Sequence, residues 1–150
     1  MKKIILSLSI AAILLSSFTI AQAAGKDPNT IVKQAFNKEF IQVKDVEWTT
    51  VNESGVYQAK FIFNNEPLQA FFAEDGQFLG TTRQLSKSQL PIIVVTALEK
   101  QYPDMHVATI FEFSKKEGTD YYITVTGTKS AMMLKASGSG ELSIYKKNVQ

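Results

Sequence analysis

The residue types that carry most enzyme chemistry are scarce in this chain. Among 150 residues there is one histidine, His106, and no cysteine. A serine triad needs a histidine base beside an activated nucleophile, and the stretch PDMHVAT around His106 contains no such motif. Zinc takes three or four ligands, whereas Asp104 and His106 form only a pair. We therefore predict that the protein is not an enzyme and has no catalytic residue, no cofactor and no metal site, with His106 at the entry of a strand.

The most acidic candidate is the stretch AFFAEDGQFLGTT, residues 70–82, in which Glu74 and Asp75 precede Gly76. A calcium loop needs oxygen ligands spaced so that they converge, and adjacent acids point to different sides. Asp-Gly between two alternating apolar segments is instead typical of a β-hairpin turn, because glycine takes a positive φ at little cost. We interpret this stretch as a hairpin.

Two further candidates also have structural interpretations. The sequence Ser137-Gly138-Ser139-Gly140 could suggest a phosphate loop, but such a loop leads into a helix and here the next segment, ELSIYKK, is typical of a strand. A glycosidase would need two carboxylates across a cleft, whereas Glu53, Glu74 and Glu117 all fall in expected turns. A hydrolase with an unrecognised site is the least favoured alternative, because the chain offers a single histidine.

The first 23 residues resemble a secretory signal peptide. Lys2 and Lys3 precede an apolar run, and Ala21-Gln22-Ala23 is a small-x-small cleavage site. A permanent membrane anchor is the rival interpretation, but the serines in the run and the Ala-x-Ala ending favour cleavage. We expect a mature chain of residues 24–150, periplasmic or secreted, with no stable membrane insertion. The absence of cysteine excludes a lipoprotein anchor and disulfides.

Composition narrows the class of partner. Apolar residues make up 45% of the chain, enough for a folded core. Without Lys2 and Lys3, lysine plus arginine would equal the 14 aspartates and glutamates, so the mature protein is formally neutral. A nucleic-acid binder needs a concentrated basic surface, and we therefore expect no nucleic-acid partner.

Helical periodicity occurs twice. Asp27 and Pro28 resemble a cap and a first helical residue before NTIVKQAFNKEF, and SKSQLPIIVVTALEKQYP repeats the pattern with Ser86 or Ser88 as cap and Pro91 in the first turn. Alternating segments separated by turn residues predict strands. These segments are 46–51, 56–63, 68–73, 77–83, 107–113, 121–127, 130–136 and 141–147.

The two halves align at a spacing of about 62–64 residues. Trp48 corresponds to Ile110, and Gly55 corresponds to Gly118. We predict an α+β fold of two tandem units, each one helix plus a four-stranded antiparallel β-meander, with the helices packed on one face of the sheet. The units would span about 27–85 and 86–147 within one compact domain, residues 24–150.

Four stretches carry a family resemblance: AFNKEFIQVKDVEW (35–48), VYQAKF (56–61), AFFAEDGQFLGTT (70–82) and SKSQLPIIVVTALEKQYP (86–103). In this order, the chain resembles the PepSY-like, β-lactamase-inhibitor-like secreted proteins of Bacteroidetes over essentially its whole mature length. The resemblance implies tandem helix-plus-meander units, no catalytic residues, and a binding or inhibitory role. It does not make a β-lactamase the target, because shared fold does not fix function.

A face of the sheet without helices would be available for binding. Alternation forces either Phe71 or Phe72, either Phe78 or Leu79, and either Tyr121 or Tyr122 onto that face. We predict a protein-binding surface, as mixed aromatic and polar patches are usual in recognition. Its predicted residues are Ile62, Phe71, Leu79 and Tyr122. The expected function is that of an exported, non-enzymatic inhibitor or modulator of an envelope or secreted protein. The alternative is a carrier of a small apolar ligand between helix and sheet.

Overall fold

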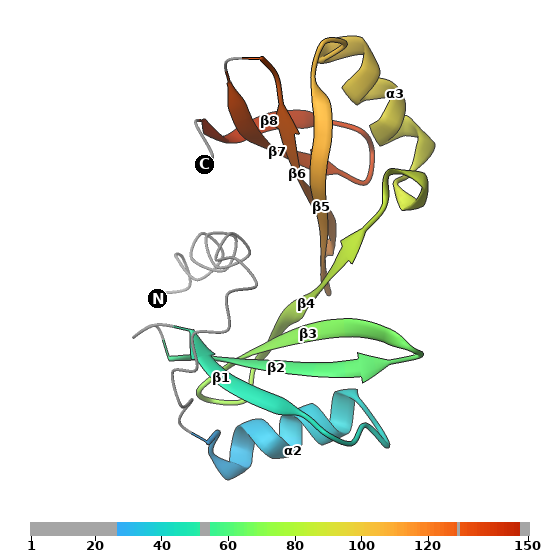
Figure 1. The fold of residues 1–150 in the computed structure, drawn as a ribbon. Helices are drawn as coiled ribbons and strands as arrows, with labels where there is room; N and C mark the ends of the chain where they lie inside the picture. The colour runs from blue at the N-terminus through green and yellow to red at the C-terminus, as the bar shows by residue number, and fades with distance from the viewer. Residues whose placement is uncertain (1–26, 52–54, 129, 148–150) are drawn as a thin grey trace.

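The structure is a computed structural model that describes residues 27–51, 55–128 and 130–147. The predicted signal peptide, residues 1–23, and Glu53 lie outside the described residues. Two α-helices and eight strands form this part of the chain (Figure 1). The helices are α2 (Thr30–Glu39) and α3 (Ile92–Gln101), and a 3-10 turn, η2 (Lys87–Gln89), precedes α3. The strands are β1 (Glu47–Val51), β2 (Val56–Phe63), β3 (Glu66–Ala73), β4 (Phe78–Leu85), β5 (His106–Lys115), β6 (Gly118–Thr126), β7 (Ala131–Ser137) and β8 (Leu142–Lys147).

All eight strands belong to one antiparallel sheet in the order β1-β2-β3-β4-β5-β6-β7-β8. The prediction of an α+β fold of two tandem helix-plus-meander units is therefore wrong: the protein is mostly β, with one continuous sheet and two helices in the described residues. The physical reason is the pairing of β4 with β5, which runs from Thr81 opposite Ser114 to Leu85 opposite Ile110. This pairing satisfies two strand edges that separate meanders would leave open. The proposed repeat boundaries, 27–85 and 86–147, stay a prediction.

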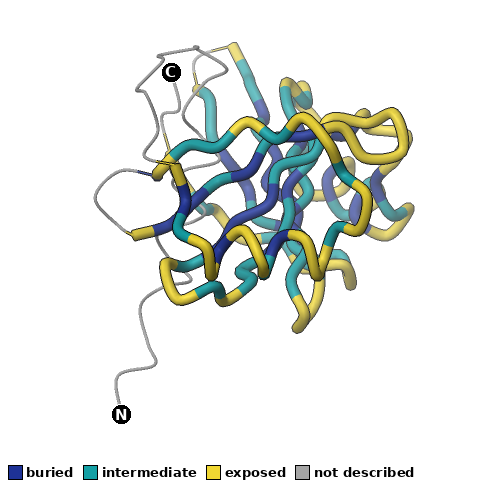
Figure 2. Tube along the Cα trace, turned by 90° about the horizontal axis from the view of Figure 1, so that it is seen from below, coloured by how far each residue is buried: buried dark blue, intermediate teal, exposed yellow. Residues whose placement is uncertain are grey.

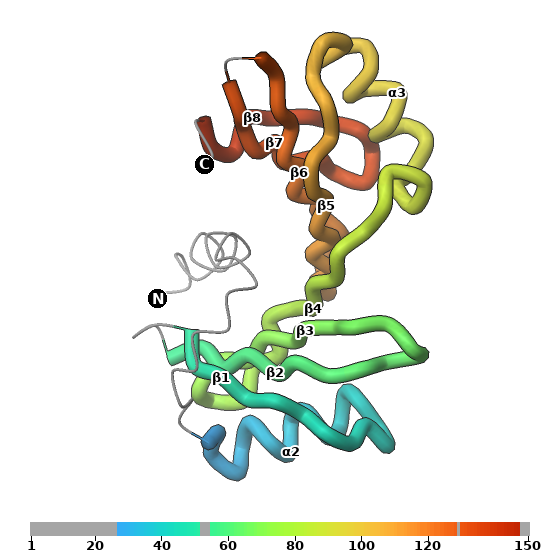
Figure 3. The backbone as a smooth tube through the Cα atoms, in the orientation of Figure 1, coloured from blue at the N-terminus to red at the C-terminus, as the bar shows by residue number. Residues whose placement is uncertain are grey.

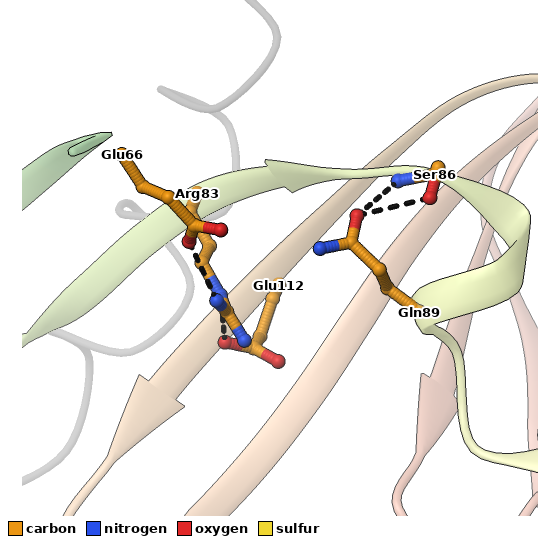
Figure 4. Close-up of polar contacts among 5 residues, drawn as sticks. All are labelled: Glu66, Arg83, Ser86, Gln89 and Glu112. Carbon is orange, nitrogen blue, oxygen red and sulfur yellow. Dashed lines mark hydrogen bonds and ion pairs between the residues drawn. The ribbon is translucent and has the colours of Figure 1, made fainter. Parts of the chain in front are cut away.

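Polar contacts reinforce the junction between β4 and the segments next to it (Figure 4). The Arg83 guanidinium donates from Nε to Glu112 of β5 at 2.9 Å and from Nη1 to Glu66 of β3 at 2.9 Å. Arg83 thus links three strands on one face, and the Glu112 hydrogen bond is the main reason that its pKa is raised. Just beyond β4, the Gln89 side chain accepts from the Ser86 backbone N–H at 2.8 Å and so closes η2.

Both helices begin at residues that differ from the predicted ones. Asn29, not Asp27, caps α2: its Oδ1 accepts from the Val32 N–H at 2.9 Å, and its Nδ2 donates to the Glu74 carbonyl at 2.9 Å. Asp27 instead pairs with Lys33 at 2.7 Å. The serine-led segment forms η2, and α3 starts only after Pro91, whose carbonyl accepts from Val94. Asp27 and Asn29, two residues apart, are both residue types that cap helices, and the local sequence does not decide which of them caps α2.

Each helix buries its apolar stripe against the same side of the sheet. The cluster beside α2 contains Val32, Phe36, Tyr57, Ala59, Phe61, Ala70 and Phe72. The cluster beside α3 contains Leu85, Leu90, Val94, Leu98, Ile110, Tyr121, Ile123, Val125, Leu134 and Ala136. Thr81 of β4 stands opposite Ala70 of the first cluster, and Leu85 of β4 belongs to the second cluster. Because Thr81 and Leu85 lie on the same face of β4, both clusters lie on one side of the sheet. We call this side the helix face.

The sheet twists and curls, so that β1–β3 lie at the bottom and β6–β8 at the top of the view, joined by β4 and β5 (Figures 1 and 3). The helices lie outside the curl. Buried residues follow the interior of the strands, whereas exposed residues gather at turns and on the outer helix surfaces (Figure 2). A right-handed twist of this kind is the ordinary state of a multi-strand sheet.

Two hairpin turns contact the first turns of the helices. Gly76 has φ 84 and its N–H donates to the Ala73 carbonyl at 2.9 Å, while Asp75 accepts from the Gln77 N–H at 3.0 Å. The acidic stretch is thus the predicted hairpin. Gly140 has a similar backbone geometry, with φ 85, and an added Cβ there would lie 2.9 Å from Cγ1 of Ile93 in α3. At Gly76 an added Cβ would lie 2.8 Å from Cγ2 of Ile31.

Candidate functional site: the open face of the sheet

The candidate site is the face of the sheet opposite both helices, which we call the open face. Its residues follow from strand alternation and register. In β2, Tyr57, Ala59 and Phe61 belong to the α2 cluster, so Gln58, Lys60 and Ile62 point the other way. Because Gln58 pairs with Phe71, the Phe71 side chain of β3 lies on the open face as well.

An apolar cluster lies at the centre of the open face, and every strand contributes to it. The buried members are Val51, Val56, Phe71, Phe113, Tyr122 and Met133, and the partly buried members are Leu79, Phe111 and Tyr145. The rings of Tyr122 and Tyr145 meet edge to face at 5.1 Å, and those of Phe71 and Phe113 at 6.5 Å. The cluster therefore spans the whole sheet, from β1 to β8, on the face opposite the two helices of the described residues.

Gly80 allows the two halves of this cluster to meet. It stands opposite Phe71, and its φ of 145 is one that side chains rarely adopt. A Cβ at Gly80 would lie 2.8 Å from Cε2 of Phe113 and 2.7 Å from the Ser114 carbonyl oxygen. The Phe113 ring therefore lies over β4 where a side chain would otherwise stand, and it reaches towards Phe71.

Neutral polar side chains cross the open face on β1 to β3. Thr49 Oγ1 donates to Gln58 Oε1 at 2.9 Å, and Gln58 Nε2 donates to Gln69 Oε1 at 2.6 Å. All three side chains are part-buried. Thr82, opposite Gln69 on β4, is 2% exposed. This half of the face presents amide and hydroxyl groups in a fixed order, with Lys60 opposite Glu47 at its margin.

A charged cluster occupies the other half, on β5 to β7. The Asp120 carboxylate accepts from Lys115 Nζ at 3.0 Å and lies 3.1 Å from Lys135 Nζ. The Asp120 side chain is 16% exposed, whereas those of Lys115 and Lys135 are 29% and 38% exposed. Lys115 Nζ also lies 5.8 Å from the centre of the Phe113 ring, a cation–π distance. Two ammonium groups thus share one carboxylate beside the apolar cluster.

Burial also alters the acidity of the tyrosines in this cluster. Loss of water contact, with a smaller effect of the Asp120 charge, raises the pKa of Tyr122 to about 12. Burial raises the pKa of Tyr145 as well. Both phenols consequently stay neutral at physiological pH, so they can donate hydrogen bonds but cannot serve as bases there.

The structure places all four predicted binding residues on the open face but does not expose them equally. Phe71 is 0% exposed and Tyr122 is 4% exposed, so both form the floor of the cluster. Leu79 is partly buried at the cluster edge, and Ile62 is 63% exposed near the β2–β3 turn. As predicted, alternation separates Phe71 from Phe72, and Tyr122 from Tyr121.

Sequence reasoning missed the residues that give this face its polar character. Gln69, Lys115, Asp120 and Lys135 were not singled out. Strand alternation could have placed Asp120 and Lys115 on the open face, because Asp120 shares a face with Tyr122 and Lys115 shares a face with Phe113. What alternation could not give is which lysines converge on Asp120, since that depends on register between strands.

The acidic and histidine candidates remain apart. His106 is exposed at the first position of β5, and Glu74 and Asp75 are exposed in the β3–β4 turn. No group of three or more metal-ligating side chains occurs within residues 27–51, 55–128 and 130–147. In the same ranges, none of the helices has the length and apolar character needed to cross a membrane.

The fold is similar to those of solved structures from Bacteroides species. A DUF2874 family protein from Bacteroides ovatus ATCC 8483 matches with a TM-score of 0.70 at 22% identity, over 80% of this chain and 89% of that chain. A BLIP-like protein from Bacteroides fragilis NCTC 9343 matches with a TM-score of 0.70 at 21% identity, over 83% and 89%. A candidate periplasmic protein from Bacteroides eggerthii DSM 20697 matches with a TM-score of 0.69 at 16% identity, over 81% and 88%.

These likenesses concern fold alone, because each identity is below one quarter. They support a BLIP-like fold for this chain. The PepSY-like part of the resemblance stays a prediction. No protein-family model matches the chain, and no curated protein sequence matches it.

Proposed function

We propose that this chain is an exported, non-enzymatic binding protein that holds another protein on the open face of its sheet. The observation that carries the proposal is the apolar cluster to which all eight strands contribute, on the face opposite the two described helices. A sheet with one helix-covered face needs no second apolar cluster for its helices to pack on. The second cluster therefore calls for a role of its own, and recognition is the role that fits.

The composition of the open face supports a protein partner. Its centre is aromatic and aliphatic, and its margins carry amides, hydroxyls and charged groups, as in protein interfaces. The partly buried residues Leu79, Phe111 and Tyr145 would supply direct apolar contact, with exposed Ile62 at one margin. Phe71 and Tyr122 would act as the floor that holds those residues in place.

The setting of the proposed function is the periplasm or the exterior. The signal-peptide pattern in residues 1–23 and the fold likeness to a candidate periplasmic protein both favour export. Likeness to a BLIP-like protein favours inhibition or modulation of an envelope or secreted protein as the outcome of binding. Occlusion of a surface on the partner would be the mechanism.

The alternative of an apolar ligand held between helix and sheet has less in its favour. Beside α2, that space is taken by the chain's own rings: Phe36 contacts Phe61 at 5.1 Å and Trp48 at 5.3 Å between ring centres. Beside α3, Val94 and Leu98 are 0% and 4% exposed against the sheet. The helix–sheet contacts thus form ordinary cores.

The test is affinity capture with residues 24–150 from the native envelope fraction, followed by mass spectrometry. An open-face variant, Lys60→Glu with Ile62→Asp, is matched by a variant on the exposed surface of α3, Lys100→Glu with Ile92→Asp. Ile62 and Ile92 are 63% and 78% exposed, so neither pair should unfold the protein. We expect the native chain and the α3-surface variant to retain the same protein, and the open-face variant to lose it. Equal retention by all three, or lipid alone, would contradict the proposal.

A further inference from the structure

We infer that the open face recognises an acidic protein surface, whose carboxylates contact Lys115 and Lys135 beside the apolar cluster. This inference rests on the proposed function and names the chemistry of the partner. It concerns β5 to β8, the half of the face that carries the charged cluster.

Charge is distributed unevenly over the open face. On β1 to β3, Lys60 stands opposite Glu47, so that half is balanced. On β5 to β8, three lysines stand against one aspartate: Lys115 and Lys135 contact Asp120, and Lys146 lies opposite Met133 of the apolar cluster. Although the mature chain is formally neutral, this half of one face has excess positive charge. A partner of complementary charge would be steered towards it.

Lys115 and Lys135 are held ready for an anion. The carboxylate of Asp120 fixes both ammonium groups, and the Phe113 ring lies under Lys115 Nζ at 5.8 Å. A single carboxylate cannot satisfy six ammonium protons, so donors remain for a ligand. Because the two side chains already lie in place, binding would cost less side-chain entropy than at free surface lysines.

The geometry favours carboxylates over phosphates. Phosphate groups are most often read by the planar fork of arginine, but the chain's single arginine, Arg83, lies on the helix face with Glu66 and Glu112. Asp120, at the centre of the lysine cluster, would repel a doubly charged phosphate more than a singly charged carboxylate. The neighbouring Tyr122–Tyr145 pair suits the apolar side chains that surround an acidic residue on a protein surface.

The probe for a first experiment is poly-L-glutamate, added to isotope-labelled residues 24–150 and followed by backbone amide NMR. We expect shifts confined to β5–β8 and weakened by salt, because the contacts are ion pairs that solvent ions can reach. Poly-L-glutamine is the neutral control, and vesicles of phosphatidylglycerol test an anionic lipid surface instead. Binding to the vesicles without binding to poly-L-glutamate would overturn the inference, and so would shifts spread evenly over both faces.

Variants separate the cluster from general surface charge. Lys115→Met with Lys135→Met should weaken binding of poly-L-glutamate by about tenfold, whereas Lys33→Met with Lys87→Met, two lysines paired with Asp27 and Glu99, should leave it unchanged. Equal losses in both double variants would overturn the inference.

The same double variant distinguishes the two proposals in the capture experiment. If Lys115→Met with Lys135→Met retains the partner protein fully while the Lys60–Ile62 variant loses it, the open face binds a protein but not through this cluster. The proposed function would then stand and the acidic-partner inference would fall. If both variants lose the partner, both proposals are supported.

Discussion

The two helix-covered cores of this sheet are built from different side chains. Beside α2 the core is a set of touching rings, in which Phe36 meets Phe40, Trp48, Phe61 and Phe72. Beside α3 the core is aliphatic, and Tyr121 is the one ring among its buried residues in the described chain. The two helices have the same length, ten residues, and cover the same face. Similar geometry can therefore be filled by a few large rings or by many branched side chains.

The difference predicts unequal responses to truncation. Phe36→Ala should destabilise the protein by about 3–5 kcal/mol, because it removes a 2% exposed ring with four ring neighbours. Leu98→Ala, at the matching contact of α3, should cost about 2–4 kcal/mol, because small branched neighbours collapse more readily into the space. Urea unfolding measures both free energies of unfolding. A larger loss for Leu98→Ala would show that ring contacts add nothing to the α2 core.

The open-face cluster connects the two regions, and its titration tests whether they unfold together. The pKa of Tyr122 is raised to about 12 from 10.0, so the folded state holds this proton more firmly than the unfolded state does. The resulting stabilisation is complete below pH 10 and is lost as the pH rises through 12. Trp48 fluorescence reports on the α2 core, and far-ultraviolet circular dichroism reports on the whole sheet.

We expect the two signals to change together between pH 10 and 12, and Tyr122→Phe to flatten the fall in stability. Loss of the Trp48 signal at a pH where the sheet signal persists would separate the two regions. An unchanged pH profile in Tyr122→Phe would assign the loss of stability to another group.

The hairpin glycines provide a smaller test of the same comparison. Gly76→Ala and Gly140→Ala each place a side chain at positive φ, at a cost of about 1–2 kcal/mol. Gly140→Ala should cost slightly more, because its Cβ would lie 3.1 Å from the Ile93 carbonyl oxygen, whereas the Cβ at Gly76 would lie 3.3 Å from the Ile31 carbonyl oxygen. Thermal unfolding gives the order. Gly127→Ala, with no contact closer than 3.5 Å, is the control and should be nearly neutral.

The smallest expected effect concerns helix caps. Asn29→Ala should cost about 1 kcal/mol, because it removes the bond to the Val32 N–H and the bond to the Glu74 carbonyl. Asp27→Ala should change stability by less than about 0.5 kcal/mol, since Asp27 is exposed and makes only a surface ion pair. Chemical denaturation of the two variants compares them. A larger loss for Asp27→Ala would restore the cap that the sequence predicted.

Short-range patterns predicted much of the local structure. The segment 56–63 is β2 to the residue, because its alternation and its flanking turns agree. Asp75-Gly76 forms the expected hairpin because both residues suit one backbone geometry. The choice of Asn29 over Asp27 was not predictable, since both are good caps and the deciding contact, Glu74, lies far away in sequence.

Long-range features were beyond sequence patterns. Pairing of β4 with β5 joins residues such as Arg83 and Glu112, and nothing local at either position indicates it. Alternation separated Phe71 from Phe72 and Tyr122 from Tyr121, but it could not show that Phe71 and Tyr122 are buried on the open face. Their burial depends on the curl of the sheet and on Gly80, which admits the Phe113 ring.

The β4–β5 pairing has a consequence for a severed chain. A cut in the connection between Leu85 and Lys87 would divide the protein into two fragments, each with a helix and four strands, but each with an unsatisfied strand edge where the other had been. Mixed together, the fragments carry complementary edges and the halves of the Arg83–Glu112 ion pair, so they could reassemble as a split protein. Kept apart, each fragment would expose an unpaired strand edge, which promotes aggregation.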